Sequence, residues 1–181
     1  SRTDWFPNTD YSNIPKKEHD WFYTWYAGAR EGIPEDCPTP RGNLVVTTTY
    51  VDANLFHDMI SGRSVTGILH LLNMTPIDWY SKLQSTVETA TFGSECVAAR
   101  TATEQILDLR LTLCYLGVPI DGPSFIFGDN ESIVNTASVP HSKLHKRHNA
   151  LSCHRTRKAI AAGITRFHHI LGTTNPADIL S

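Results

Sequence analysis

Residues 43–56 read NLVVTTTYVDANLF, and this stretch decides the fold. The run from Val45 to Val51 is β-branched and aromatic with no breaker, which is typical of a strand with at least one buried face. Asp52 follows directly, and the small or polar residues Ala53 and Asn54 come after it. A carboxylate at the end of an apolar strand is costly to bury unless it is paired or binds a cation. Asp52 is therefore either a turn cap or a ligand.

Two further strands and a long helix follow this run. Residues 65–72 (VTGILHLL) and 77–82 (IDWYSK) predict strands, and the short turn between them makes them antiparallel neighbours. From Ser94, apolar residues recur every three or four positions, a period that predicts an amphipathic helix. Gly117 and Pro119 end this helix.

The remaining elements alternate between strand and helix. They are a buried strand at 125–127, a short helix at 130–135, a helix at 144–162, a strand at 164–171, and a final helix that Asn175-Pro176 opens and the end of the sequence truncates. The order β-β-β-α-β-α-β-α predicts an α/β domain. Its mixed sheet has an antiparallel edge followed by parallel strands.

Four carboxylates occupy comparable places in this layout. Asp52 and Asp129 end strands, whereas Glu95 and Asp178 lie in the first turns of helices. Four such groups brought together would repel, and hard divalent cations such as Mg²⁺ relieve the repulsion. Two ions in a carboxylate site can activate a water and stabilise the leaving oxygen of a phosphodiester. The pattern favours a metal-dependent reaction at phosphate.

Length and composition agree with one soluble globular domain. The chain has 181 residues, of which 40% are hydrophobic, and its formal net charge is −2. No apolar run reaches the length of a membrane span and no signal peptide is present, so we expect no membrane partner. The four cysteines are scattered without a C-x-x-C pair, and we interpret them as reduced thiols of an intracellular protein.

Charge is distributed unevenly along the chain. Between Glu131 and Asp178 there is no acidic residue, but there are seven basic ones: Lys143, Lys146, Arg147, Arg155, Arg157, Lys158 and Arg166. Such a one-sided stretch favours a polyanion, most simply a nucleic acid, over a merely solvated helix face. A zinc site built from the histidines and Cys153 of the same stretch fits no standard finger spacing.

Residues 1–42 are different in character. They combine aromatic residues with five prolines that break any long element. We expect an N-terminal extension, or a connector to an upstream domain, followed by the main domain at 43–181.

Several short motifs, in this order and spacing, resemble the ribonuclease H domain of copia-type LTR retrotransposon polyproteins over roughly residues 43–181. They are Val51-Asp52-Ala53, Arg63-Ser64-Val65-Thr66-Gly67, Trp79-Tyr80-Ser81-Lys82-Leu83-Gln84, Ser94-Glu95-Cys96-Val97-Ala98, Gly117-Val118-Pro119, Gly128-Asp129-Asn130-Glu131-Ser132 and Asn175-Pro176-Ala177-Asp178-Ile179. The resemblance implies a ribonuclease H-like fold, with a five-stranded mixed sheet and helices on both faces. It also implies hydrolysis of the RNA strand of RNA–DNA hybrids with two Mg²⁺ ions, for which Mn²⁺ can substitute.

The resemblance also implies residue roles and partners. The metal-binding, catalytic acids carry over onto Asp52, Glu95, Asp129 and Asp178. Asn54, Ser94 and Asn130 resemble groups that reach RNA 2′-hydroxyls, and Lys143, Lys146, Arg147 and Arg155 would follow the hybrid's phosphates. The expected partners are the hybrid and an upstream reverse transcriptase domain of the same polyprotein. The expected location is intracellular: the cytoplasm and its virus-like particles, or the nucleus.

Departures and alternatives remain open at this stage. Many ribonucleases H have a mobile histidine shortly before the fourth acid, where this chain has Leu171-Gly172-Thr173-Thr174; His168 and His169 lie on the preceding strand. The alternatives are a catalytically weak or inactive tether that only binds hybrid, a transposase or integrase core, and a protein-binding module that uses residues 1–42. A transposase or integrase core would end its acid series with Glu, whereas this series ends with Asp178.

Overall fold

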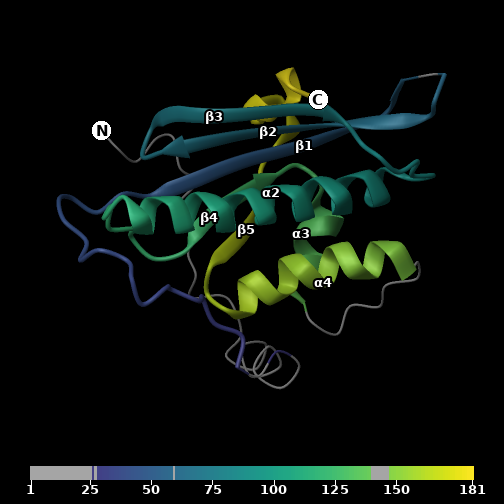
Figure 1. Ribbon diagram of the computed structural model, residues 1–181. Helices are drawn as coiled ribbons and strands as arrows, with labels where there is room; N and C mark the ends of the chain where they lie inside the picture. The colour runs from purple at the N-terminus through teal and green to yellow at the C-terminus, as the bar shows by residue number, and fades with distance from the viewer. Residues whose placement is uncertain (1–25, 27, 59, 140–146) are drawn as a thin grey trace.

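The computed structural model describes residues 26, 28–58, 60–139 and 147–181. Its centre is a five-stranded sheet in the order β3-β2-β1-β4-β5 (Figure 1). The strands are β1 (Thr47–Asp58), β2 (Arg63–Leu72), β3 (Thr75–Leu83), β4 (Ser124–Gly128) and β5 (Thr165–His169). The first three are antiparallel, and β4 and β5 run parallel to β1. The predicted mixed sheet is confirmed.

β1 is longer than the sequence predicts, and Asp52 lies within it rather than after it. The strand continues because β2 still offers it a partner: Asp52 pairs with Gly67 and Asn54 with Val65. On its other side, β1 pairs with β4 only as far as Tyr50. Asp52 therefore lies just beyond the parallel part of the sheet, where β1 and β4 diverge.

In the described part of the chain, three α-helices accompany the sheet: α2 (Thr91–Tyr115), α3 (Glu131–Ser138) and α4 (Arg147–Ala161). α2 begins before the predicted Ser94, so Glu95 lies in its second turn and not in its first. The predicted final helix is a short 3-10 turn, η3 (Pro176–Ile179), preceded by η2 (Gly172–Thr174). Residues 144–146 of the predicted basic helix lie outside the described residues, as do Lys143 and Lys146 among the predicted phosphate contacts.

The helices lie on both faces of the sheet. α2 packs on β1 and β2 from one side, α4 packs on the outer side of α2, and η3 contacts β1 and β2 from the other side (Figure 1). The core between sheet and helices combines Val51, Ile68 and Ile126 of the strands with Ala98 and Ile106 of α2. Small side chains on α2 let it approach the sheet closely, which brings Glu95 next to β1.

The described part of the N-terminal region, up to residue 46, runs along the far end of α2. Arg110 of α2 is nearly buried and binds Glu31 through two hydrogen bonds, of 2.6 and 2.8 Å. The amide of Arg41 donates to the carbonyl of Gly117 at 2.8 Å. This region therefore packs against the main domain, while the predicted boundary at residue 42 stays a prediction.

In the described part of the chain, no helix combines the length and the apolar character needed to cross a bilayer.

Candidate metal centre and nucleic-acid interface

Three of the four predicted acids converge at one end of the sheet. Asp52 comes from the middle of β1, Glu95 from α2, and Asp129 from the residue after β4. One carboxylate oxygen of each lies within 4.8 Å of the others. Because β1 and β4 are parallel, their carboxylates reach the same edge, and the start of α2 adds the third.

Asp178 lines the same hollow but is not part of this three-carboxylate group. The hollow is open, measures about 620 Å³, and is also lined by Asn54, Asn130 and Glu131. Asp178 is carried by η3. Its charge contributes to the electrostatics of Asp52, as described below. Glu131 was not predicted as a site residue, although it lies two positions after Asp129.

Burial and repulsion from neighbouring carboxylates disfavour the ionised forms of Glu95 and Asp52. Burial, followed by the charges of Asp52 and Asp129, raises the pKa of Glu95 to about 9. Burial also raises the pKa of Asp52, with smaller contributions from Asp129 and Asp178, while a hydrogen bond from Ser181 opposes the rise. Clustered oxygen ligands that resist ionisation suit a divalent cation, which would neutralise all of them at once.

The C-terminal turn is fixed against β1 by contacts that were not predicted. Asn175 donates from Nδ2 to the carbonyl of Val51 at 3.0 Å, and its Oδ1 accepts from the amide of Ala177 at 3.1 Å. The hydroxyl of Ser181 donates to Oδ2 of Asp52. An Asn before Pro is a typical helix cap, so the sequence can predict that Asn175 caps η3. The sequence cannot predict the long-range contact of Asn175 with Val51.

Gly67 makes this packing possible. It lies opposite Asp52 on β2, and a Cβ at this position would be 2.5 Å from the carbonyl oxygen of Ala177 and 2.8 Å from the amide of Ser181. A larger residue would push the C-terminal turn, and with it Asp178, away from the sheet.

The predicted nucleic-acid contacts around the acids lie in different environments. Asn54 is exposed and lines the hollow, with its Nδ2 3.4 Å from Nδ1 of His57. Asn130 also lines the hollow and caps α3, since its side chain accepts from the amide of Ile133. Ser94 is fully buried, and its hydroxyl donates to the carbonyl of Thr91 at 2.9 Å. Ser94 therefore offers no surface to a ligand in this conformation.

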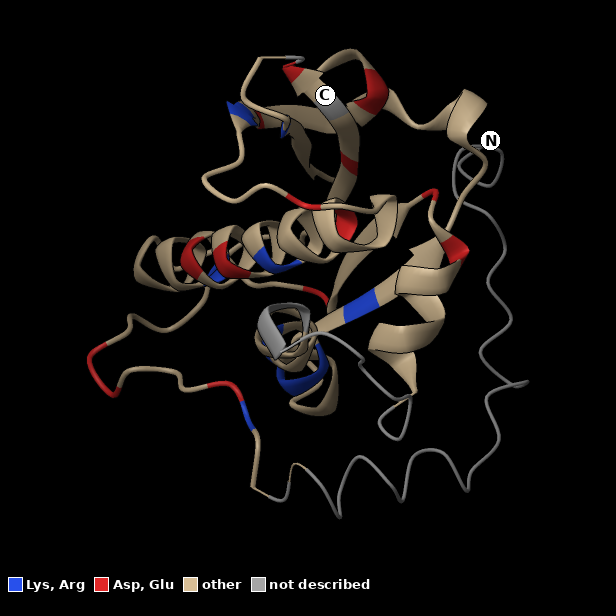
Figure 2. Ribbon diagram, turned by 90° about the vertical axis from the view of Figure 1, so that its right-hand side faces the viewer, with Lys and Arg blue, Asp and Glu red and all other residues tan. Residues whose placement is uncertain are grey.

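The basic residues of α4 lie away from the acids. In Figure 2, the described part of α4 carries basic positions and no acidic ones. Arg155 is exposed and lines a second hollow of about 320 Å³ together with Arg30 and Lys158. Arg157 is buried and donates to the carbonyl of Thr136 at 2.8 Å, so it has a structural role. The side chain of Arg147 lies outside the described residues.

The two histidines at the end of β5 point in different directions. Nε2 of His169 lies 2.9 Å from the backbone carbonyl of Asp129, next to the acidic group. His168 packs against Phe125 and Phe127, and burial, with a smaller effect of Arg166, lowers its pKa to about 4. Of this pair, His169 is the one beside the site.

Comparison with solved structures identifies the fold. The N-terminal RNase H domain from Mycobacterium tuberculosis superposes with a TM-score of 0.59 and 10% identity, over 76% of this chain and 91% of that one. RNase H1 from Halobacterium salinarum gives a TM-score of 0.57 and 14% identity, over 74% and 92%. LC11-RNase H1, solved in complex with an RNA/DNA hybrid, superposes with a TM-score of 0.58 and 17% identity, over 74% of this chain and 92% of that one. The chain has the ribonuclease H fold.

Comparison with curated sequences gives its relatives. The retrovirus-related Pol polyprotein from transposon TNT 1-94 of Nicotiana tabacum is 26% identical over 167 residues, 92% of this chain. That from transposon RE2 of Arabidopsis thaliana is 26% identical over 141 residues, 78% of the chain. The chain spans only 12% and 10% of these polyproteins. No protein-family model matches the sequence. The predicted resemblance to the ribonuclease H domain of a copia-type retrotransposon Pol polyprotein is thus confirmed.

Proposed function

We propose that this chain is a metal-dependent endonuclease that hydrolyses the RNA strand of RNA–DNA hybrids during reverse transcription of a retrotransposon. The observation that carries the proposal is the convergence of Asp52, Glu95 and Asp129 in an open hollow, with Asp178 at its rim. Because the chain shares the fold of ribonucleases H, hydrolysis of the RNA strand of a hybrid is the reaction that best fits these acids.

The donor set fits hard divalent cations. All of the converging ligand atoms are carboxylate oxygens, which Mg²⁺ prefers and Mn²⁺ also accepts. Asp52, Glu95 and Asp129 would hold the metal, and Asp178 would complete a second position. Two bound ions would supply an activated water and stabilise the leaving oxygen.

The chain's own residues would position the substrate. Asn54 and Asn130 lie at the rim of the hollow, where their amides can reach ribose hydroxyls of the cleaved strand. Arg155, with Lys143, Lys146 and Arg147, would bind phosphates further along the hybrid and give affinity without reading sequence. In this proposal the upstream reverse transcriptase domain is part of the same polyprotein, and the protein acts inside the cell, in cytoplasmic virus-like particles or in the nucleus.

A second candidate, a hybrid-binding tether with weak or no activity, draws support from one contact. The hydroxyl of Ser181 binds an oxygen of Asp52, and Asp178 stands apart from the other three acids. With one oxygen of Asp52 hydrogen-bonded and Asp178 apart, the protein could still bind a hybrid, but fewer carboxylate oxygens would be available to a metal ion.

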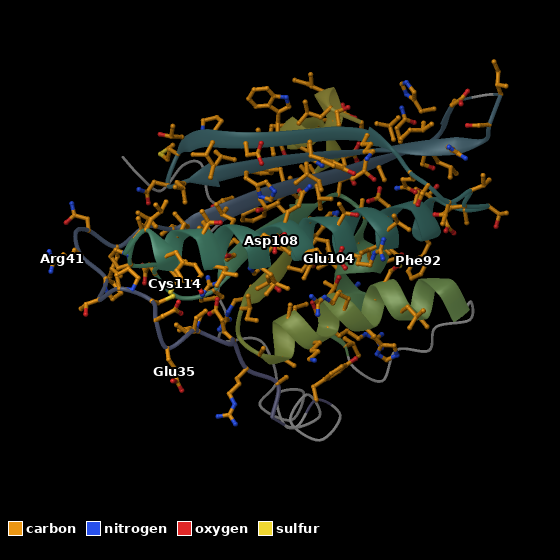
Figure 3. The ribbon with its side chains drawn as sticks, viewed as in Figure 1. Glu35, Arg41, Phe92, Glu104, Asp108 and Cys114 are labelled. Atoms are coloured by element: carbon orange, nitrogen blue, oxygen red, sulfur yellow. The ribbon has the colours of Figure 1, made fainter. Side chains whose placement is uncertain are left out.

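Cleavage of a labelled RNA–DNA hybrid with Mg²⁺ or Mn²⁺ separates these functions. We expect metal-dependent cutting of the RNA strand alone, abolished by EDTA and by Asp52→Asn or Asp129→Asn, with hybrid binding retained. Asp108→Asn is the matched control, because Asp108 is exposed on α2 well beyond the Phe92 end of the helix (Figure 3). Binding without cutting under either metal would favour the tether. Equal cutting by the Asp52→Asn protein would refute both the assigned site and the proposed function.

A further inference from the structure

Two of the four cysteines, which are far apart in the sequence, meet in the structure. The Sγ atoms of Cys96 on α2 and Cys153 on α4 lie 2.8 Å apart, although the residues are 57 positions apart in the chain. Both are free thiols.

Cys96 and Cys153 lie where α2 packs against α4. Cys96 and Cys153 are almost fully buried, and both belong to the hydrophobic core. Along the same contact between the helices, the hydroxyl of Thr103 donates to that of Thr156 at 3.3 Å. A disulfide bond is about 2.05 Å long, so a relative shift of less than about 1 Å would bring the two sulfurs to bonding distance.

We propose that Cys96 and Cys153 form a redox-sensitive disulfide site that joins α4 to α2. In a reducing compartment the pair stays as thiols, and the bond forms when the ratio of oxidised to reduced low-molecular-weight thiol rises. The proposal stands apart from the nuclease function, because it needs neither metal nor hybrid.

The closing reaction is thiol–disulfide exchange with a low-molecular-weight disulfide as oxidant. The thiolate of Cys153 attacks one sulfur of the oxidant, which breaks the oxidant's S–S bond and releases one small thiol. Cys96 then loses its proton and attacks the sulfur of Cys153 in the mixed disulfide, which releases the second small thiol. Two electrons pass from the protein thiols to the oxidant, and two small thiols are formed.

The environment of Cys153 assigns it the first step. A hydrogen bond from Cys96, and then the charge of Arg157, lower the pKa of Cys153, although its burial opposes this. The thiolate is the attacking species in exchange, so this cysteine is the better nucleophile of the pair. Its near-complete burial means that the reagent reaches it during local opening of α4.

Peptide mapping of the oxidised full-length chain tests the pairing. The reduced protein is incubated over a series of ratios of oxidised to reduced glutathione, quenched in acid, blocked with N-ethylmaleimide, digested and examined by mass spectrometry. We expect a cross-linked peptide that joins Cys96 to Cys153. Cross-links of either cysteine to another partner, or Cys96 and Cys153 both blocked at the most oxidising ratio, would overturn the proposal.

Thermal melts of the same samples give a second readout. Because a disulfide across so long a loop restricts the unfolded chain, we expect the oxidised protein to melt roughly 10 °C higher than the reduced one. Cys153→Ala should lose both the cross-link to Cys96 and the rise in melting temperature on oxidation, whereas Cys37→Ala should keep both. If a variant fails to fold, the peptide map of the unaltered protein still tests the proposal. An oxidised protein that melts no higher than the reduced one would show that Cys96 and Cys153 are not placed for this bond.

Discussion

We expect the ionisation of Glu95 to control metal binding at the proposed site. Its pKa of about 9 in the folded protein lies far above the ordinary value of 4.5, mainly because of burial and then because of Asp52 and Asp129. Between these two values the folded, metal-free protein holds a proton that the unfolded chain has lost. Its stability therefore falls as the pH rises through this window.

A bound cation must displace that proton, so metal affinity should rise with pH. We expect the increase in melting temperature caused by MgCl₂ to be small at pH 6 and to grow steadily towards pH 9. Melts with and without the metal measure this, with CaCl₂ and NaCl at matched ionic strength as controls. A magnesium effect of equal size at every pH would contradict the assignment of Glu95 as a ligand.

At this scale, Asp52, Glu95 and Asp129 stand out because each is a charge beside an apolar strand or near a helix start. Four acids can be chosen from eighteen in many ways, so their assignment to one site came from the resemblance, and their role as metal ligands stays a prediction. The positions of Ser181 and Asn175 against β1 depend on how a turn 124 positions away packs, which no local pattern encodes. For Ser94 the resemblance implied a contact to RNA, while the fold buries this side chain.

Among the elements, the C-terminal turn is the one on which Asp178 depends. Asn175→Ala would remove both the cap of η3 and the hydrogen bond to Val51, and would leave that buried carbonyl without this donor. We expect a loss of about 1–3 kcal/mol in the free energy of unfolding, with weaker cleavage. Chemical denaturation measures the first and the hybrid assay the second. Asn175→Asp keeps only the cap, so its free energy of unfolding should lie between those of the unaltered protein and Asn175→Ala. If it is as unstable as Asn175→Ala, the cap contributes nothing to stability.

Gly67 provides a test of position rather than stability. Gly67→Ala places a methyl group against the backbone of residues 177 and 181, which must move. Because displacements near 1 Å in an active site are costly, we expect cleavage to fall by about 100-fold while the fold is retained. Circular dichroism and the hybrid assay measure the two effects. Gly32→Ala is the control, since a Cβ there meets nothing within 4 Å and cleavage should not change.

The elements themselves were largely predictable, and their ends were not. Alternating β-branched runs and the period of α2 are local patterns, so the order of strands and helices follows from them. β1 continues to Asp58 only because β2 supplies partners beyond Asp52, and α2 begins at Thr91 although the apolar period starts later. Both ends are set by contacts between elements.

In the described part of the molecule, buried His70 and half-buried His168 make the folded state less stable in acid. Nδ1 of His70 lies 2.8 Å from the hydroxyl of Thr49 and its Nε2 lies 3.0 Å from Oε1 of Gln105, a pairing that suits the neutral ring. Burial lowers the pKa of His70, and that of His168 is about 4. Below their ordinary value of 6.5 the unfolded chain gains protons that the folded protein excludes.

The histidine contribution to stability should therefore fall as the pH drops from 6.5 towards 4, while the raised pKa of Glu95 acts in the opposite direction. Urea denaturation at pH 7, 6 and 5, without metal, of the unaltered protein and of His168→Phe isolates the contribution of His168. This variant keeps an aromatic ring against Phe125 and Phe127, and its stability relative to the unaltered protein should rise as the pH drops. A difference between the two proteins that does not change with pH would assign the acid response to other groups.

The N-terminal segment contributes to the stability of the domain through Glu31. Removal of residues 1–42 would leave the guanidinium of Arg110 buried without its carboxylate partner. We expect the fragment 43–181 to fold but to lose about 1.5–3 kcal/mol of unfolding free energy, as for other hydrogen bonds to charged groups. Denaturation of both proteins measures this. Arg110→Met in the fragment should recover part of the loss; if it instead destabilises the fragment further, the unpaired charge is not the cause.

The position of β1 at the centre of the sheet has a consequence for synthesis of the chain. β1, β2 and β3 emerge first and can pair as soon as they leave the ribosome, because their connections are short. The other edge of β1 must wait for β4, as the hydrogen bond of Thr47 to Ser124, 77 positions later, makes plain. Throughout that interval the nascent protein presents a row of unpaired backbone groups on a β-branched strand, the kind of edge that recruits foreign strands. Co-translational chaperones would be needed at this stage more than at any later one.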